Sequence, residues 1–292
     1  MATPVRIIEK NTTYMCQRNT SERRFFLKPS KKANAIIQYA MAWAAQKHGM
    51  LIHEYLFQMN HYHMVITDVH GNLPDFNRDF HAMVSRALGY LHKRRWPIWS
   101  HESYNACKLL SKEATLDAIT YTLNNPIKDG LVSTLKKWLG LNSAQLQYGE
   151  PRMIQKPEIF FSEELPEEVE LQVWPAPELE HVSKEQILEA VEENRLELCQ
   201  RHKASGYRFI GMTKLLKQRL TDSPESLKAL FKLKPTLKAK NRWLMLEAIQ
   251  RKKDFTLAYQ RALKEFKERE DKPVFPEGTY GLLRLGIVQV KT

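Results

Sequence analysis

The chain has 292 residues, of which 43% are hydrophobic and 10% aromatic, enough apolar surface for one large or two ordinary folded domains. No apolar run approaches the roughly 20 residues that span a bilayer, and the N-terminus lacks a signal-peptide pattern, so we expect no membrane association and a cytoplasmic location. Three widely spaced cysteines argue against a disulfide framework or a cysteine zinc site: Cys16, Cys107 and Cys199.

The net charge of +12 is unevenly distributed along the chain. Residues 1–150 carry +8 (19 basic against 11 acidic), residues 151–198 carry −9 (4 against 13) and residues 201–292 carry +13 (22 against 9). Two basic segments joined by an acidic one are typical of proteins that bind a polyanion. A merely soluble basic protein is the alternative.

The N-terminal half alternates strand and helix patterns. Strands are predicted from β-branched content and helices from apolar residues that recur every three to four positions. Ser111 is a candidate N-cap, Gly49 a helix stop, and Pro126 a helix end. The predicted elements are a strand within 5–18, a helix over 33–49, two strands over 50–60 and 61–69 (or one long strand bent near Asn60), a helix over 75–95, a strand within 101–110 and a helix over 111–125.

This order of elements predicts an α+β fold. Strand, helix, strand, strand, helix, strand is the ferredoxin-like order, in which two helices cover one face of an antiparallel sheet. The helix over 111–125 is additional to that set. The other sheet face is therefore where unusual polar residues of the strands would be used.

The remaining sequence predicts two further segments. Residues 141–182 are acidic and contain proline, which favours a linker or an extended arm over a core element. Residues 183–292 form a basic, mainly helical extension, with helical periodicity over 183–200 and 237–269 and a turn with a short strand near the end. We therefore divide the chain into residues 1–140, 141–182 and 183–292.

Two histidines lie two positions apart in an apolar strand, within the stretch QMNHYHMVITD. Side chains alternate across a strand, so His61 and His63 project from one face and Tyr62 from the other. Two adjacent imidazoles can hold a divalent metal ion. The alternative is a pair of hydrogen-bonded core histidines without a metal.

A second polar pattern follows in the helix over 111–125. Tyr121 and Asn125 are four residues apart and share a helix face, and Asp117 lies one turn earlier. A tyrosine hydroxyl beside a metal, next to an amide that could ligate it, can act as a nucleophile on phosphorus. The alternative is that Tyr121 is a core residue and Asn125 an ordinary residue at a helix end.

HYHMVITD together with YTLNNPIKDGLV resembles the REP-associated tyrosine transposases of the single-tyrosine HUH family (IS200-like). The matching residues are Asn60 to His63, Tyr121 to Pro126, Lys128, and Gly130 to Val132. The resemblance covers about residues 5–140, and the later FPEGTY segment is similar to the C-terminal extensions of some of these proteins. Met59 replaces the family's usual small residue, which we expect to affect packing more than chemistry.

The resemblance implies a function and a role for each motif residue. His61 and His63 would bind Mg²⁺ or Mn²⁺ with Asn125 as third ligand, and Tyr121 would be the nucleophile. The implied activity cleaves and rejoins single-stranded DNA beside a hairpin through a 5′-phosphotyrosine link. The implied partner is single-stranded DNA with a hairpin, at the nucleoid. The sequence leaves open a monomer or homodimer, and whether Tyr121 serves its own chain.

Candidate DNA contacts are basic and aromatic residues outside the two motifs. Arginine and lysine can contact the backbone and tryptophan can stack on unpaired bases. The candidates are Arg18, Arg23, Arg24, Lys93, Arg94, Arg95, Trp96 and Trp99. The alternative for each is a solvated charge or a core aromatic residue.

Other functions remain open from the sequence. The alternative to an enzyme is a domesticated DNA-binding regulator that kept the fold but lost strand transfer. A relaxase or replication initiator would commonly show a third histidine or a second catalytic tyrosine. A ferredoxin-like RNA-binding domain would carry aromatic residues on its strands in place of the two histidines.

Overall fold

The structure is a computed structural model that describes residues 6–95, 97–158, 161–224, 235–268, 273–284, 286 and 289–290. Its main sheet has the strand order β2-β3-β1-β4-β7. The strands are β1 (Thr12–Asn19), β2 (Met50–Phe57), β3 (His61–Asp68), β4 (Asn105–Leu109) and β7 (Leu237–Lys238). The first four pair antiparallel in the ferredoxin-like order, and β7 pairs parallel to β4. The predicted α+β fold is confirmed.

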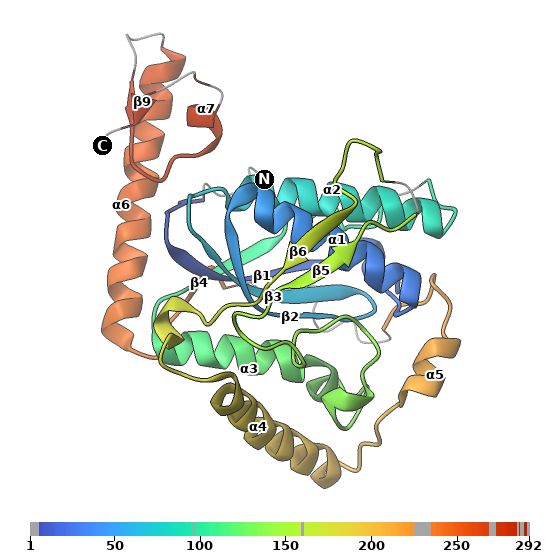
Figure 1. Cartoon of the computed structure of the whole chain (residues 1–292). Helices are drawn as coiled ribbons and strands as arrows, with labels where there is room; N and C mark the ends of the chain where they lie inside the picture. The colour runs from blue at the N-terminus through green and yellow to red at the C-terminus, as the bar shows by residue number, and fades with distance from the viewer. Residues whose placement is uncertain are drawn as a thin grey trace.

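Two helices, α1 (Lys31–His48) and α2 (Leu73–Leu91), cover one face of this sheet (Figure 1). The alternation predicted for β3 is confirmed: Tyr62, Met64 and Ile66 are fully buried in the core against these helices. A third helix, α3 (Lys112–Lys128), lies on the opposite face, where Val65 packs against it. The residues of β3 that alternate with Tyr62 therefore face α3.

Helix α3 begins where the sequence predicts and ends later. The Ser111 hydroxyl accepts a hydrogen bond from the backbone N–H of Ala114, as expected of an N-cap. Pro126 was predicted to end the helix, but the helix continues through it to Lys128. Proline removes one backbone donor, and here that loss falls in the last turn, where few helical bonds remain to be broken.

The segment predicted as a linker or arm is part of the folded body. Residues 141–182 form a hairpin of β5 (Arg152–Gln155) and β6 (Glu168–Leu171), whose buried side chains join the main core. Glutamates alternate with apolar residues in β6, so its outer face is acidic while Val169 and Leu171 are buried. The composition of this segment suggested a linker because it counts the exposed acidic residues and the buried apolar residues of β6 together.

The C-terminal region is mainly helical, as predicted. Helix α4 (Lys184–Ala204) packs along α3, with Ile187 and Val191 in the cluster beneath it. The other elements are the short helices η1 (Ser21–Arg23), η2 (Leu135–Lys137) and η3 (Pro177–Leu179), then α5 (Met212–Lys217), α6 (Arg242–Lys267), β8 (Val274–Phe275), α7 (Gly281–Arg284) and β9 (Gln289–Val290). Among the described residues, no helix combines the length and the apolar character needed to cross a bilayer.

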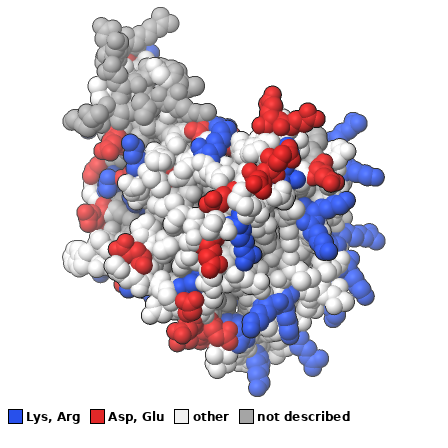
Figure 2. All heavy atoms as spheres, in the orientation of Figure 1, with Lys and Arg blue, Asp and Glu red and all other residues white. Residues whose placement is uncertain are grey.

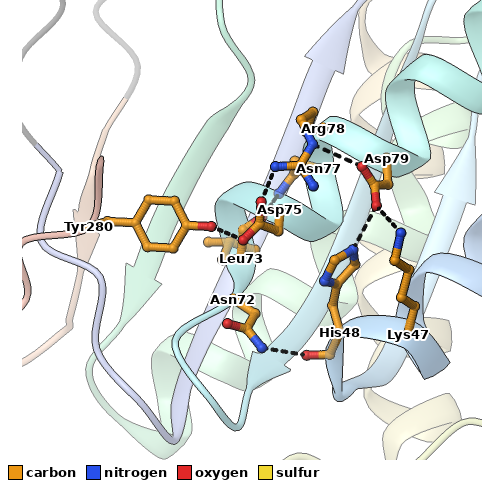
Figure 3. Close-up of polar contacts among 9 residues, drawn as sticks. All are labelled: Lys47, His48, Asn72, Leu73, Asp75, Asn77, Arg78, Asp79 and Tyr280. Atoms are coloured by element: carbon orange, nitrogen blue, oxygen red, sulfur yellow. Dashed lines mark hydrogen bonds and ion pairs between the residues drawn. The ribbon is translucent and has the colours of Figure 1, made fainter. Parts of the chain in front are cut away.

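The FPEGTY segment docks on the first half of the chain (Figure 3). The Tyr280 hydroxyl donates a hydrogen bond to the Asp75 carboxylate at the start of α2. The backbone N–H of Ile8 donates to the carbonyl of Gly278 at 3.0 Å. Residues 278–280 therefore contact both the N-terminal segment and the start of α2.

Candidate active site

His61 and His63 lie side by side on the sheet face that α3 covers. Their ring centroids are 5.0 Å apart and the rings are nearly perpendicular. Tyr62 points into the opposite core and shares a 2.8 Å hydrogen bond with the ring of His81. The predicted separation of the three side chains by strand alternation is therefore present.

Helix α3 brings Tyr121 and Asn125 to the two histidines. The ring centroids of Tyr121 and His63 are 5.1 Å apart, and the Asn125 side-chain oxygen lies 3.0 Å from Nε2 of His61. All four residues belong to one chain, so Tyr121 stands beside the histidines of its own sheet. Residues about sixty positions apart in sequence thus form one cluster.

Burial keeps both imidazoles uncharged. It lowers the pKa of His61 and lowers that of His63 far below the usual range, because the charged form loses its hydration. The Asn60 side-chain oxygen lies 2.7 Å from Nδ1 of His61, and the Asn125 oxygen lies 3.0 Å from Nε2. An uncharged imidazole has one N–H and can donate to only one of these two oxygens, so its other nitrogen presents a lone pair to an acceptor. A cation bound between Nε2 and the Asn125 oxygen would use a lone pair of each.

These residues fit a divalent metal ion. They offer neutral imidazole nitrogens and an amide oxygen, and Nδ1 of His63 is buried without a hydrogen-bond partner in the described structure. The described residues contain no group of three or more His, Cys, Asp or Glu side chains placed to hold a metal. A metal held by the two histidines would need a third protein donor of another kind, and the Asn125 oxygen lies 3.0 Å from Nε2 of His61. Mn²⁺ tolerates such a mixed set, and Mg²⁺ usually completes its shell with water and phosphate oxygens.

Three neighbouring residues were not assigned to the site by the sequence. Gln58 donates hydrogen bonds to the Asn125 oxygen and, at 3.0 Å, to the Asp129 carboxylate. The Lys128 ammonium donates to the Tyr121 hydroxyl at 3.2 Å. Lys128 is seven residues after Tyr121, close to two full turns, so the helical period predicts that both lie on one face of the helix. Gln58 could be found only from the register of the β2–β3 hairpin.

Asp117, which lies one turn before Tyr121 on α3, is engaged elsewhere. Its carboxylate forms ion pairs with Lys240 at 3.3 Å and Lys238 at 3.8 Å. The group that contacts the Tyr121 oxygen is the Lys128 ammonium.

The proposed stacking role of Trp99 is wrong. Its side chain is only 5% exposed, its ring lies among the core aromatics, and its Nε1 donates to the carbonyl of His81 at 2.9 Å. A buried ring cannot stack on a base without leaving the core. Trp96 lies outside the described residues.

The basic candidates differ in how much of each side chain is available. Lys93 and Arg95 are exposed, and Arg23 is half-buried. Arg24 forms an ion pair with Glu22.

The other two arginines are held by the protein. The Arg94 guanidinium lies 3.8 Å from the centre of the Phe26 ring, and Arg18 donates to the carbonyl of Ser100 at 3.1 Å. Lys93 and Arg95 are therefore the candidates most free to contact a backbone phosphate.

Basic side chains gather on one edge of the molecule. Figure 2 shows lysine and arginine along the edge where α5 and the nearest end of α1 lie, and acidic side chains over the β5–β6 hairpin. Lys31 and Lys32 begin α1, Lys214 and Lys217 belong to α5, and all four are exposed. A cavity of about 490 Å³ lies elsewhere, between β4 and α6. It is not lined by His61, His63, Tyr121 or Asn125.

Comparison with known proteins gives limited resemblance. No family model matches the chain, and no curated protein matches it. Among solved structures it is similar to a REP-associated tyrosine transposase bound to a REP hairpin, with 15% identity, a TM-score of 0.42, and coverage of 49% of this chain and 82% of that one. It is also similar to a "putative transposase" from Deinococcus radiodurans R1, with 17% identity, a TM-score of 0.28, and coverage of 36% and 84%.

Proposed function

We propose that this protein is a metal-dependent transposase that cleaves and rejoins single-stranded DNA beside a hairpin. The observation that carries the proposal is the cluster of His61, His63, Tyr121 and Asn125. In it a tyrosine hydroxyl, two uncharged imidazoles and an amide oxygen meet on one sheet face within one chain. A protein that only binds DNA has no chemical need for this combination.

The residues divide the chemistry between them. His61, His63 and Asn125 would hold a divalent metal ion, which supplies charge stabilisation at the scissile phosphate when bound. The Tyr121 oxygen attacks phosphorus, the bond from phosphorus to the 3′ oxygen breaks, and that oxygen leaves as a 3′-OH after taking a proton. The 5′ phosphate remains on Tyr121. A 3′-OH can reverse the reaction without ATP, because the covalent link retains the phosphodiester energy.

The surroundings of the site support a single-stranded polyanion as substrate. The net charge is +12, and exposed lysines of α1 and α5 gather on one edge (Figure 2). Contacts between such lysines and backbone phosphates give affinity and strong salt dependence rather than sequence readout. The Tyr121 side chain is half-buried, so the backbone of one unpaired strand reaches it with less obstruction than a duplex does. The hairpin follows from the motif resemblance.

The experiment uses single-stranded oligonucleotides that carry the imperfect palindromes flanking the gene, labelled at the 3′ end. Incubation with Mg²⁺ or Mn²⁺ should give a slow-migrating protein–DNA adduct on a denaturing gel. We expect Tyr121→Phe to lower adduct formation at least about a thousandfold, because it removes the nucleophilic oxygen. EDTA should abolish the adduct as well.

The matched control is Tyr259→Phe, in α6, which should form the adduct at the wild-type rate. DNA binding by the wild type with no adduct under any metal would contradict the proposal. That result would favour the regulator that kept the fold and lost the reaction.

A further inference from the structure

Lys128 contacts the oxygen atom that the proposed reaction uses. Its ammonium donates a hydrogen bond to the Tyr121 hydroxyl at 3.2 Å and lies 4.6 Å from the centre of the Tyr121 ring. Both residues are on α3, nearly two turns apart, so they share one helix face. The contact is therefore built into the helix and does not depend on a distant segment.

The position of Lys128 is supported by its neighbour Asp129. One carboxylate oxygen of Asp129 lies 3.9 Å from the Lys128 ammonium, and the other accepts the hydrogen bond from Gln58. Gln58 also donates to Asn125. A chain of polar contacts therefore links the nucleophile's partner to the residue proposed as metal ligand.

The charge of Lys128 suits this place in the fold. The last turn of a helix favours a cation, because the backbone carbonyls there carry partial negative charge. The side chain of Lys128 is 46% exposed and that of Asp129 is 37% exposed, so solvent screens their attraction. Lys128 thus retains hydrogen-bonding capacity for an oxygen that becomes negative.

We propose that Lys128 is a catalytic residue that stabilises charge on the Tyr121 oxygen, an inference that rests on the proposed function. In cleavage, the Tyr121 oxygen bonds to phosphorus and gives its proton to solvent, while the bond to the 3′ oxygen breaks. In rejoining, a 3′-OH oxygen bonds to phosphorus and loses its proton to solvent. The bond to Tyr121 then breaks, and the phenolate accepts a charge-assisted hydrogen bond from Lys128 before it regains a proton.

A lysine that only held the DNA backbone would behave differently. Its removal would weaken binding, and the loss of rate would disappear at saturating DNA. A lysine on the reacting oxygen slows the chemical step itself, in both directions. Single-turnover rates of cleavage and of rejoining at saturating oligonucleotide separate these two roles.

The test compares wild type, Lys128→Met, Lys128→Arg and Lys112→Met. Removal of one preorganised donor costs up to about a thousandfold, so we expect Lys128→Met to slow both steps between about tenfold and a thousandfold. Lys128→Arg keeps the charge and donors and should restore most of the rate. Lys112 is exposed at the other end of α3, so its variant should match wild type.

Each result decides between the proposals. Wild type that forms the adduct, with Lys128→Met within threefold of it at saturating DNA, overturns the role of Lys128 and leaves the proposed function standing. A loss that Lys128→Arg does not restore also overturns the role of the charge. Wild type that forms no adduct overturns the proposed function and this inference with it. Because Lys128 is exposed, a circular dichroism spectrum should show all four proteins equally folded.

Discussion

A buried ion pair joins Lys184, the first residue of α4, to Glu54 of β2, an edge strand of the main sheet. The Glu54 carboxylate accepts hydrogen bonds from the Lys184 ammonium, from the Tyr148 hydroxyl at 2.9 Å and from the Ser143 hydroxyl. Glu54 is fully buried and the side chain of Lys184 is 2% exposed. Such a pair gives little net stability over apolar residues, but losing one partner leaves an unpaired charge in the interior.

We expect Lys184→Met to lower the free energy of unfolding by about 3–5 kcal/mol, because Glu54 then stays buried without its counter-charge. The double variant Glu54→Gln with Lys184→Met should recover part of that loss. Urea denaturation of the single and the double variant measures the two free energies of unfolding. Lys203→Met, an exposed lysine of the same helix, is the control and should change the free energy by less than about 0.5 kcal/mol. A single Lys184→Met variant as stable as this control would contradict the expectation.

At the scale of single residues, the sequence predicted the clustered side chains through two periodicities. Alternation placed His61 and His63 on one face, and the four-residue spacing placed Tyr121 above Asn125. Gln58 and Trp99 show where such reasoning stops. The contacts of Gln58 depend on strand register, and the burial of Trp99 depends on how the loop after α2 returns to the core. Neither is encoded in a local repeat.

At the scale of elements, α3 is held by a segment far along the chain. The backbone N–H groups of Ile210 and Gly211 donate to the carbonyls of Gly130 and Leu131, at 3.0 Å and 2.8 Å. Gly130 has a φ of +70°, a conformation that glycine adopts at low cost. A Cβ at this position would lie 2.2 Å from the Tyr207 ring. Glycine therefore allows both the turn and the close packing of Tyr207.

We expect Gly130→Ala to lower the free energy of unfolding by at least about 1–2 kcal/mol, from the left-handed backbone alone, with a further loss from the clash. Adding Tyr207→Ala should remove the clash and restore that part of the free energy of unfolding. The part lost to the left-handed backbone should remain lost. Urea denaturation measures both terms, and limited proteolysis should show earlier cleavage within 205–222 in the single variant. Gly206→Ala is the control for a left-handed glycine with open space at its Cβ. Equal losses in Gly130→Ala and Gly206→Ala would exclude the clash with Tyr207.

The boundaries of the elements show where predictions from single residues or local composition hold and where packing changes them. The helix stop at Gly49 and the N-cap at Ser111 were predicted, because each rests on one residue's own backbone or side chain. The stop at Pro126 was wrong because packing of the last turn outweighs one missing donor. The linker over 141–182 was wrong because burial of alternate side chains in β6 depends on the presence of the α1 surface.

At the scale of the whole molecule, the order of elements could be predicted and the packing of the C-terminal region could not. Each N-terminal element has an apolar face that identifies it. In α4 the charged residues dominate the pattern, and only Ile187 and Val191 with the stem of Lys184 are buried. Its place along α3 is fixed by the Glu54 pair and by the Asn124 side chain, which donates to the carbonyl of Val191 at 2.7 Å. Such contacts cannot be read from either segment alone.

The buried histidines predict how the free energy of unfolding of the whole molecule changes as the pH falls. Burial lowers the pKa of His53 to about 4, and it also lowers the pKa of His61, His63, His81 and His92. The ring of His53 is held by the carbonyl of Trp174 at 2.9 Å and the hydroxyl of Thr67 at 2.8 Å. In the unfolded chain a histidine titrates near pH 6.5. Between these values the unfolded state binds a proton that the folded state does not.

The sign follows from this difference in bound protons. Above about pH 6.5 neither state is protonated at His53, and the stability does not depend on pH through this residue. As the pH falls from 6.5 to about 4, the free energy of unfolding should fall by about 1.4 kcal/mol per unit, or about 3 kcal/mol in total for His53. Asp79 acts in a lower window. Burial raises the pKa of Asp79, but its bonds to Lys47, His48 and Arg78 (Figure 3) together outweigh this and lower the pKa, so its contribution to stability is lost only below about pH 4.

Urea denaturation at pH 7.5 and pH 5.0 measures the histidine window separately from that of Asp79. We expect His53→Gln to be less stable than wild type at pH 7.5, because it disturbs two buried hydrogen bonds, yet to lose less stability between the two pH values. The difference between the proteins should be about 2 kcal/mol, the contribution of one proton over 1.5 units. His101→Gln removes an exposed histidine and should keep the wild-type pH dependence. An equal loss of stability in wild type and His53→Gln would mean that His53 is protonated in the folded protein at pH 5.0.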